Sequence, residues 1–172
     1  MSPASKLLDF KEGRLVFLGM YTGIRFKGYV KPEFRGGFEK IAFEGKWGKH
    51  HDRVLRDFAY EDRSDRIPCG MLSCMPEEWF DWKGNYKWQE IHDGFHRQYD
   101  PKTGYWAFAC SLKNYFGTID AWIGILPHFI EKIDHLEVLY EEWEYSKQYD
   151  IVDGVTTMVN DKFIKYGFKE DR

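Results

Sequence analysis

Residues 118–133 read TIDAWIGILPHFIEKI, and this stretch decides the helical part of the fold. Its apolar side chains recur every three or four positions, which is the spacing of one face of an α-helix. Thr118 stands where an N-cap side chain accepts a hydrogen bond from the first helical turn. Pro127 removes a hydrogen bond and its ring clashes with the preceding turn, so we expect a kink or a split there. The apolar stripe consists of Ile119, Trp122, Ile123, Leu126, Phe129, Ile130 and Ile133.

The residues that follow this helix predict antiparallel strands. In YDIVDGVTTM (149–158), Asp153 and Gly154 lie between two apolar runs. An Asp-Gly pair favours a two-residue type I′ hairpin turn, because both turn residues need a positive φ. The preceding segment HLEVLYEEWEYS (135–146) fits a helix or a strand. We favour a strand for residues 136–146, because a hairpin follows directly.

A three-stranded meander is predicted for residues 86–112. A second Asp-Gly pair, at 93–94, forms its first turn, and in that register Trp88 faces Tyr99 across the hairpin. The sequence DPKTG at 100–104 forms its second turn, because proline presets φ and glycine supplies the left-handed position.

Three further elements complete the expected fold. Thr-Gly at 22–23 separates RLVFLGMY from IRFKGYV and suggests another hairpin. Residues 76–82 begin with Pro-Glu-Glu, which is typical of a first helical turn. A short helix is expected over residues 51–60, burying Val54, Leu55, Phe58 and Ala59. The sequence therefore predicts an α+β fold, a single domain over residues 1–172, in which a largely antiparallel β-sheet packs against one main helix and two short helices.

The composition is that of a folded, soluble protein. The 172 residues include 14 Phe, 11 Tyr and 7 Trp, which argues against disorder, and no apolar stretch is long enough to span a membrane. The 25 basic and 28 acidic residues give a formal net charge of −3, which argues against a nucleic-acid partner. Three cysteines and an N-terminus without a signal-peptide pattern favour the cytoplasm. Because the edge strands of a sheet have unpaired backbone groups, a homodimer formed through an edge strand stays an alternative.

The candidates for a metal or catalytic site are His92, His96 and Cys69. On a helix, His92 and His96 would share a face and could bind zinc, but the predicted hairpin points them to opposite faces. Four residues separate Cys69 from Cys74, a gap unlike that of zinc and redox motifs, and we interpret Cys69 as a structural thiol. A hydrolase assembled from these residues and acidic side chains stays an alternative. No cofactor is expected.

A second cluster contains His128, Glu131 and His135. If the helix continued past Ile133, these three side chains would project together, opposite the apolar stripe and into solvent. We expect a solvated face rather than a catalytic site. It could still bind a partner or respond to pH, because histidine titrates near neutrality.

The aromatic and acidic residues give the main functional hypothesis. Four tryptophans have charged neighbours in the sequence: Trp47, Trp79, Trp82 and Trp143. We expect part of their ring surface to be exposed to solvent or to contact a partner. Residues 131–153 contain eight acidic side chains and two lysines. We therefore expect a small binding or regulatory protein, inhibitor- or immunity-like, that engages a protein partner through an aromatic and acidic face. The candidate contact residues are Trp143, Tyr145, Glu141, Glu142 and Glu144. A carbohydrate or small-ligand receptor is a further alternative.

Overall fold

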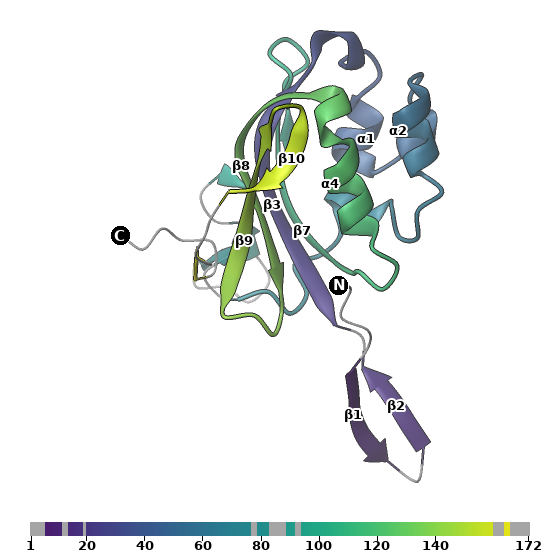
Figure 1. Cartoon of the computed structure of the whole chain (residues 1–172), viewed down its shortest axis with the longest axis vertical. Helices are drawn as coiled ribbons and strands as arrows, with labels where there is room; N and C mark the ends of the chain where they lie inside the picture. Colours follow the sequence, from purple (N-terminus) through teal and green to yellow (C-terminus); the bar gives the residue numbers. More distant parts are fainter. Residues whose placement is uncertain are drawn as a thin grey trace.

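The computed structural model describes the backbone of residues 6–11, 14–18, 20–76, 79–82, 89–91, 94–159 and 164–165, and the side chains of 20–76, 79 and 94–159. Its main sheet has seven antiparallel strands in the order β10-β9-β8-β3-β7-β6, with β11 also paired to β9 (Figure 1). These strands are β3 (Tyr21–Val30), β6 (Gln98–Tyr99), β7 (Tyr105–Lys113), β8 (Ile130–Tyr140), β9 (Tyr145–Val152), β10 (Val155–Met158) and β11 (Ile164–Lys165). Two separate ribbons pair β1 (Lys6–Lys11) with β2 (Arg14–Leu18), and β4 (Phe80–Trp82) with β5 (Gln89–Ile91).

The helices gather on one side of this sheet (Figure 1). The longest is α4 (Thr118–Phe129), and the short ones are α1 (Glu39–Glu44), α2 (Arg53–Phe58), α3 (Arg66–Cys69) and the 3₁₀ turns η1 (Pro32–Phe34) and η2 (Trp47–Lys49). Strands β7 and β8 are both antiparallel to β3 and therefore parallel to each other, with α4 as the crossover between them. The predicted α+β fold with a largely antiparallel sheet is confirmed.

The main helix is shorter than the predicted 118–133. It ends at Phe129, and Ile130 already has the extended φ of −101° and ψ of 124° that starts β8. Lys31 satisfies the end of the helix, because its backbone N–H donates to the Phe129 carbonyl at 2.8 Å and its Nζ donates to the Pro127 carbonyl at 2.9 Å. The predicted stripe is buried within the helix at Ile119, Trp122, Ile123, Leu126 and Phe129.

Pro127 lies inside the last turn of α4, and its effect is local. A proline has no N–H, so the carbonyl oxygen of Ile123, four residues earlier, loses its helical donor. The hydroxyl of Thr156 on β10 donates to this oxygen at 2.8 Å. The gap in the helix thereby becomes the attachment point of the outer hairpin.

The start of α4 corrects the predicted N-cap. The cap position is Gly117, with a left-handed φ of 71°. Asn114 supplies the capping oxygen, because its Oδ1 accepts from the Ile119 N–H at 2.9 Å. Thr118 instead donates its hydroxyl to the backbone carbonyl of Asp62, which ties the helix to the segment after α2.

Two predicted turns are confirmed, and one predicted strand is confirmed in part. Asp153 and Gly154 have φ values of 50° and 75° and join β9 to β10, as a type I′ turn requires. Gly104, with a φ of 78°, donates its N–H to the Asp100 carbonyl at 2.8 Å, closing the turn between β6 and β7. The strand predicted for 136–146 is confirmed only at its two ends, because residues 136–140 belong to β8, residues 145–146 belong to β9, and residues 141–144 form the turn between them.

The predicted hairpin at 22–23 is wrong. Strand β3 runs through Thr22 and Gly23 without a turn, and β2 pairs with β1 instead. Gly23 is needed for close packing, because a Cβ at this position would collide with the sulfur of Met75 and the ring of Trp79.

The first hairpin of the predicted meander is also wrong. Strand β5 pairs with β4, which places Glu90 opposite Asp81, and Tyr99 of β6 faces Trp106 of β7. Trp88 and Asp93 lie outside the described residues. Gly94 has the positive φ of 74° that a turn favours, but among the described residues β5 pairs with β4 and not with residues 95–99.

The short helices agree with the sequence only in part. Helix α2 buries Leu55 and Phe58 as predicted, but Val54 and Ala59 are exposed. The predicted helix over 76–82 is wrong at its end, because Phe80–Trp82 forms β4, and residues 77–78 lie outside the described part of the chain.

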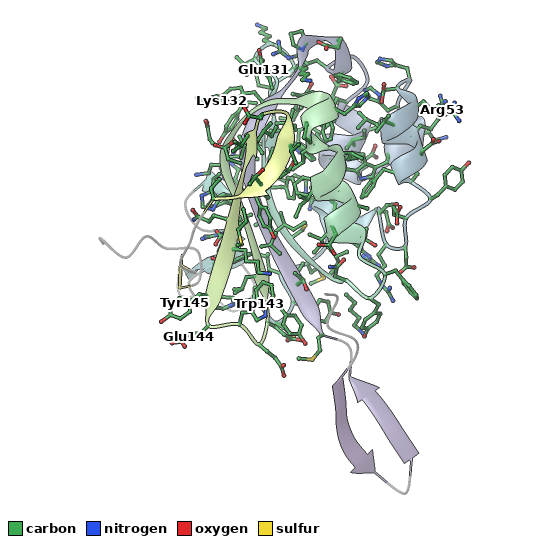
Figure 2. The ribbon with its side chains drawn as sticks, viewed as in Figure 1. Arg53, Glu131, Lys132, Trp143, Glu144 and Tyr145 are labelled. Carbon is green, nitrogen blue, oxygen red and sulfur yellow. The ribbon has the colours of Figure 1, made fainter. Side chains whose placement is uncertain are left out.

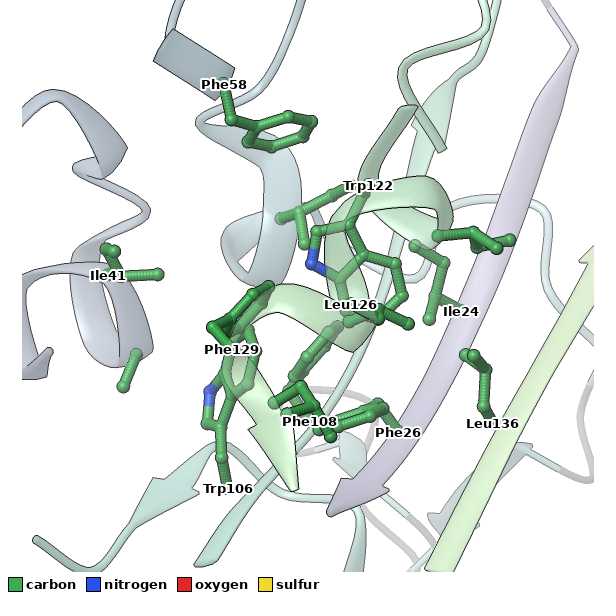
Figure 3. Close-up of a cluster of buried hydrophobic side chains, with 14 of the residues drawn as sticks. Ile24, Phe26, Ile41, Phe58, Trp106, Phe108, Trp122, Leu126, Phe129 and Leu136 are labelled. Carbon is green, nitrogen blue, oxygen red and sulfur yellow. The ribbon is translucent and has the colours of Figure 1, made fainter. Parts of the chain in front are cut away.

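The core between the sheet and the helices is built largely from aromatic rings (Figure 3). Phe26 of β3 lies at its centre, with ring centroids 5.3 Å from Trp106, 5.6 Å from Phe108 and 5.6 Å from Trp122. Such offset and edge-to-face contacts stabilise a core beyond the burial of area alone.

Two of the four tryptophans expected near the surface are core residues. Trp47 is buried and donates its indole N–H to the Ile67 carbonyl at 2.8 Å, and Trp79 is buried on the other face of the sheet. Their charged neighbours in the sequence were misleading, because the partners that bury them come from distant segments. The side chain of Trp82 lies outside the described part.

Asp52 caps α2, since its Oδ2 accepts from the Leu55 N–H at 3.1 Å. We expect Asp52→Ala to lower the free energy of unfolding by about 1 kcal/mol, because the orphan N–H loses its acceptor. Asp52→Asn keeps a capping oxygen, so its free energy of unfolding should fall much less. Urea denaturation of both variants checks this, and an Asp52→Ala protein as stable as the wild type would contradict the capping role.

Candidate functional site

The described residues do not assemble the predicted metal or hydrolase site. The Cys69 sulfur lies 3.5 Å from the Phe43 carbonyl oxygen and 3.6 Å from Arg97 Nη1, and burial raises the pKa of this thiol. His96 is exposed and has Gln98 Nε2 3.3 Å from its Nε2, while His92 lies outside the described residues. Within the described part, no group of three His, Cys, Asp or Glu side chains is placed to hold a metal ion.

The second histidine cluster is dispersed because α4 ends at Phe129, before Glu131 and His135. His128 on α4 has its Nε2 3.0 Å from Asp52 Oδ2. Glu131 lies at the start of β8, 3.8 Å from Arg35. His135, further along β8, has its Nε2 2.8 Å from Glu137 Oε1. The shared helical face required a helix past Ile133, and the structure has none there.

A buried ionic network that the sequence analysis missed lies on the sheet face away from α4. Arg25 of β3 and Glu137 of β8 are direct cross-strand partners, 2% and 0% exposed, and Arg25 Nε donates to Glu137 Oε1. His135 contacts the same carboxylate oxygen, and Ser146 Oγ donates to the other oxygen at 2.9 Å.

Aromatic rings enclose this network. The guanidinium of Arg25 lies 4.7 Å from the ring centroids of both Trp79 and Phe95, a cation–π contact with each ring. Burial opposes ionisation of Glu137, but the hydrogen bond from His135 and the charge of Arg25 hold its pKa below the ordinary value. We assign the network a structural role, because it fixes the pairing of β3 with β8. In the sequence, the signal for this pair is a charged residue inside each of two apolar strands, Arg25 in β3 and Glu137 in β8.

The predicted partner-binding residues meet at the turn between β8 and β9, at one end of the sheet (Figure 2). Trp143 is half-buried and packs on a small apolar cluster containing Met75, Trp79 and Leu139. Its ring lies 5.8 Å from the ring of Tyr140 in an edge-to-face contact. The nearby segments thus hold this indole in place.

Three glutamates line the same pocket as Trp143. Glu141 accepts the Tyr21 N–H at 2.8 Å, which ties the turn to the start of β3, while Glu142 and Glu144 are exposed. An open pocket of about 400 Å³ is lined by Cys74, Pro76, Leu139 and residues 141–144. Tyr145, 37% exposed, begins β9 beside it. We call this group, residues 141–145, the acidic turn.

Of the helices in the described part of the chain, none combines the length and apolar character needed to cross a membrane. Compared with protein-family models, curated proteins and solved structures, the chain shows no significant match. The function is therefore inferred from the residues of this chain alone.

Proposed function

We propose that this protein is a small binding or regulatory protein whose acidic turn takes up a basic segment of a protein partner. The observation that carries the proposal is the open pocket that Glu141, Glu142 and Glu144 line together with the half-buried Trp143. Aromatic anchors near complementary charge are typical of the energetic centre of protein interfaces.

The position of Trp143 supports an anchoring role. Packing on the apolar cluster below it lowers the conformational entropy that an interface side chain loses on binding. Lys147 Nζ already lies 4.5 Å from the ring centroid, so this indole is placed where it stabilises a cation. A lysine or arginine of a partner would meet the same ring and the same carboxylates.

The charge of the turn supports a basic partner. Exposed carboxylates speed the encounter with a basic surface, and salt weakens this steering. The hydrolase alternative has less support, because the described residues place no imidazole within hydrogen-bond distance of Cys69. The three cysteines are free thiols, which is consistent with the reducing cytoplasm. A homodimer through an edge strand stays a prediction, and β10 and β6 are the strands at the ends of the sheet path.

The test is capture of partners from a native lysate at low and high salt, followed by affinity measurement with the purified partner. We expect Glu144→Lys to weaken binding about tenfold, because it sets like charges against each other. Trp143→Ala should weaken binding by about thirtyfold or more, as truncation of an anchoring residue does. Circular dichroism establishes that each variant is folded.

Glu33→Lys is the matched control. Glu33 is exposed in η1, which follows the far end of β3, and the substitution changes the net charge by the same amount. It should bind like the wild type. The proposal would be overturned if Glu144→Lys and Glu33→Lys bound the partner with equal affinity. It would also be overturned if no salt-sensitive partner were captured.

A further inference from the structure

A second pocket, of about 300 Å³, opens where β7 ends. Its lining includes Tyr21, Arg63, Arg66, Ser73, Ser111 and Lys113. We propose that this pocket binds the phosphate group of a small phosphorylated molecule. The inference is independent of the proposed function, because the acidic turn contributes none of the residues that line this pocket.

The charge of the pocket is positive. Arg63, Arg66 and Lys113 line it, and no acidic side chain of the described residues does. Arg63 is ion-paired with its neighbour Asp62, whereas Arg66 and Lys113 have no carboxylate partner within the described part of the chain. Two uncompensated cations and a third, partly compensated one favour an anionic ligand.

The loop that forms the wall is fixed to the sheet. The hydroxyl of Ser111 on β7 lies within hydrogen-bond distance of the carbonyl oxygens of Met71 and, at 3.1 Å, of Ser73, so it donates its one proton to either of them. Gly70 allows this approach, because a Cβ there would collide with the Ser111 carbonyl oxygen. The pocket is therefore largely preformed, which limits the entropy lost when a ligand binds.

Arg63 has a strained backbone. Its φ of 59° lies in the left-handed region, which arginine rarely adopts. Its guanidinium lies 5.1 Å from the ring of Tyr115, and its side chain lines the pocket. Such strain is typical of residues held in place at ligand sites.

The residue types indicate a phosphate group. Guanidinium groups match the geometry of phosphate oxygens with paired N–H donors, and a lysine ammonium adds a point charge. Ser73, which also lines the pocket, is a residue with a hydroxyl donor. The volume lies at the lower end of the range for ligand pockets, which favours a small molecule.

The surroundings argue against a long polyanion. Tyr21 lies opposite Lys113 in the sheet, and its N–H donates to the side chain of Glu141, the residue that follows β8. The acidic turn thus begins one strand away from the pocket. Its carboxylates would repel an extended phosphate backbone, whereas a single phosphate group fits inside the basic lining.

The test uses isothermal titration calorimetry of the full chain with inorganic phosphate and with glycerol 3-phosphate, at constant ionic strength set with chloride. We expect binding by the wild type, and affinity at least about tenfold lower in Arg66→Gln and Lys113→Gln, since each loses a charge-assisted hydrogen bond. Arg53→Gln is the matched control, because Arg53 lies on α2, away from the pocket (Figure 2). It should bind like the wild type.

Lys113→Arg keeps the charge and should bind within about threefold of the wild type, so the proposal stays testable if a glutamine variant fails to fold. Three results would overturn it: no binding of either phosphate by the folded wild type, equal loss in Arg53→Gln, or tighter binding of a single-stranded dodecathymidylate than of glycerol 3-phosphate. The third result would indicate a nucleic-acid surface.

Discussion

Replacing Glu137 with glutamine will lower the free energy of unfolding by about 3–5 kcal/mol, as the loss of one partner from a buried ion pair does. The carboxylate is fully buried and receives donors from Arg25, His135 and Ser146. A neutral amide leaves the Arg25 charge without its counterion, inside a site walled by Trp79 and Phe95. Urea denaturation at pH 7 measures the loss.

The same substitution should change the acid sensitivity of the protein. The pKa of Glu137 is lower in the folded chain than in the unfolded chain, where it is about 4.3. Its contribution to stability is therefore complete above that unfolded value and disappears as the pH falls through the lower folded value. Between pH 5 and 3 we expect the stability of the wild type to fall more steeply than that of Glu137→Gln.

Two controls isolate the role of the buried pair. Glu33→Gln removes an exposed carboxylate and should change the stability by less than about 0.5 kcal/mol. The double variant Arg25→Met, Glu137→Leu removes both charges and should recover most of the loss. If Glu137→Gln and Glu33→Gln are equally stable, the ion pair contributes nothing and the prediction fails.

The second large effect is expected from Trp106→Ala, at about 3–5 kcal/mol. Trp106 is fully buried, with ring centroids 4.7 Å from Phe108, 5.0 Å from Phe38 and 5.3 Å from Phe26. Truncation removes the ring against which these three pack and leaves a cavity. Loss of near-ultraviolet circular dichroism and a lower urea midpoint would report it.

A milder variant keeps this prediction testable if the alanine protein does not fold. The indole N–H of Trp106 has no hydrogen-bond partner among the described residues, so Trp106→Phe loses volume but no hydrogen bond. Trp106→Phe should lower the free energy of unfolding clearly less than the alanine substitution does. Tyr60→Ala is the control, because Tyr60 is 89% exposed. An alanine variant at 106 that matches this control would refute the central position of the ring.

The parts of the fold that the sequence predicted correctly depend on neighbours in the chain. The Asp153-Gly154 turn needs only two residues with positive φ, and the stripe of α4 needs only helical spacing. The position of β3 between β7 and β8 depends instead on segments about eighty to one hundred and twenty residues apart. No local pattern indicates that pairing, and a Thr-Gly pair within an apolar stretch therefore resembles a turn when only its neighbours in the chain are considered.

The sites divide in the same way. The acidic turn is one continuous stretch, so its residues could be named from the sequence, although not that Glu141 is tied to Tyr21. The second pocket takes its cations from residues 63–66 and from Lys113, and the buried pair joins positions 25 and 137. Sites whose residues come from distant segments cannot be predicted from the sequence alone, because the fold has to bring those segments together first.

The bond between Thr156 and Ile123 has a consequence for how copies of this protein behave beside one another. An outer strand with free backbone groups invites a neighbouring chain to add a strand, which is the first step of sheet-driven aggregation. Here the short β10 is held to the helix by a hydroxyl that Pro127 makes room for. We therefore expect Thr156→Val, which removes this hydroxyl, to loosen β10 and to make concentrated protein precipitate earlier on storage than the wild type.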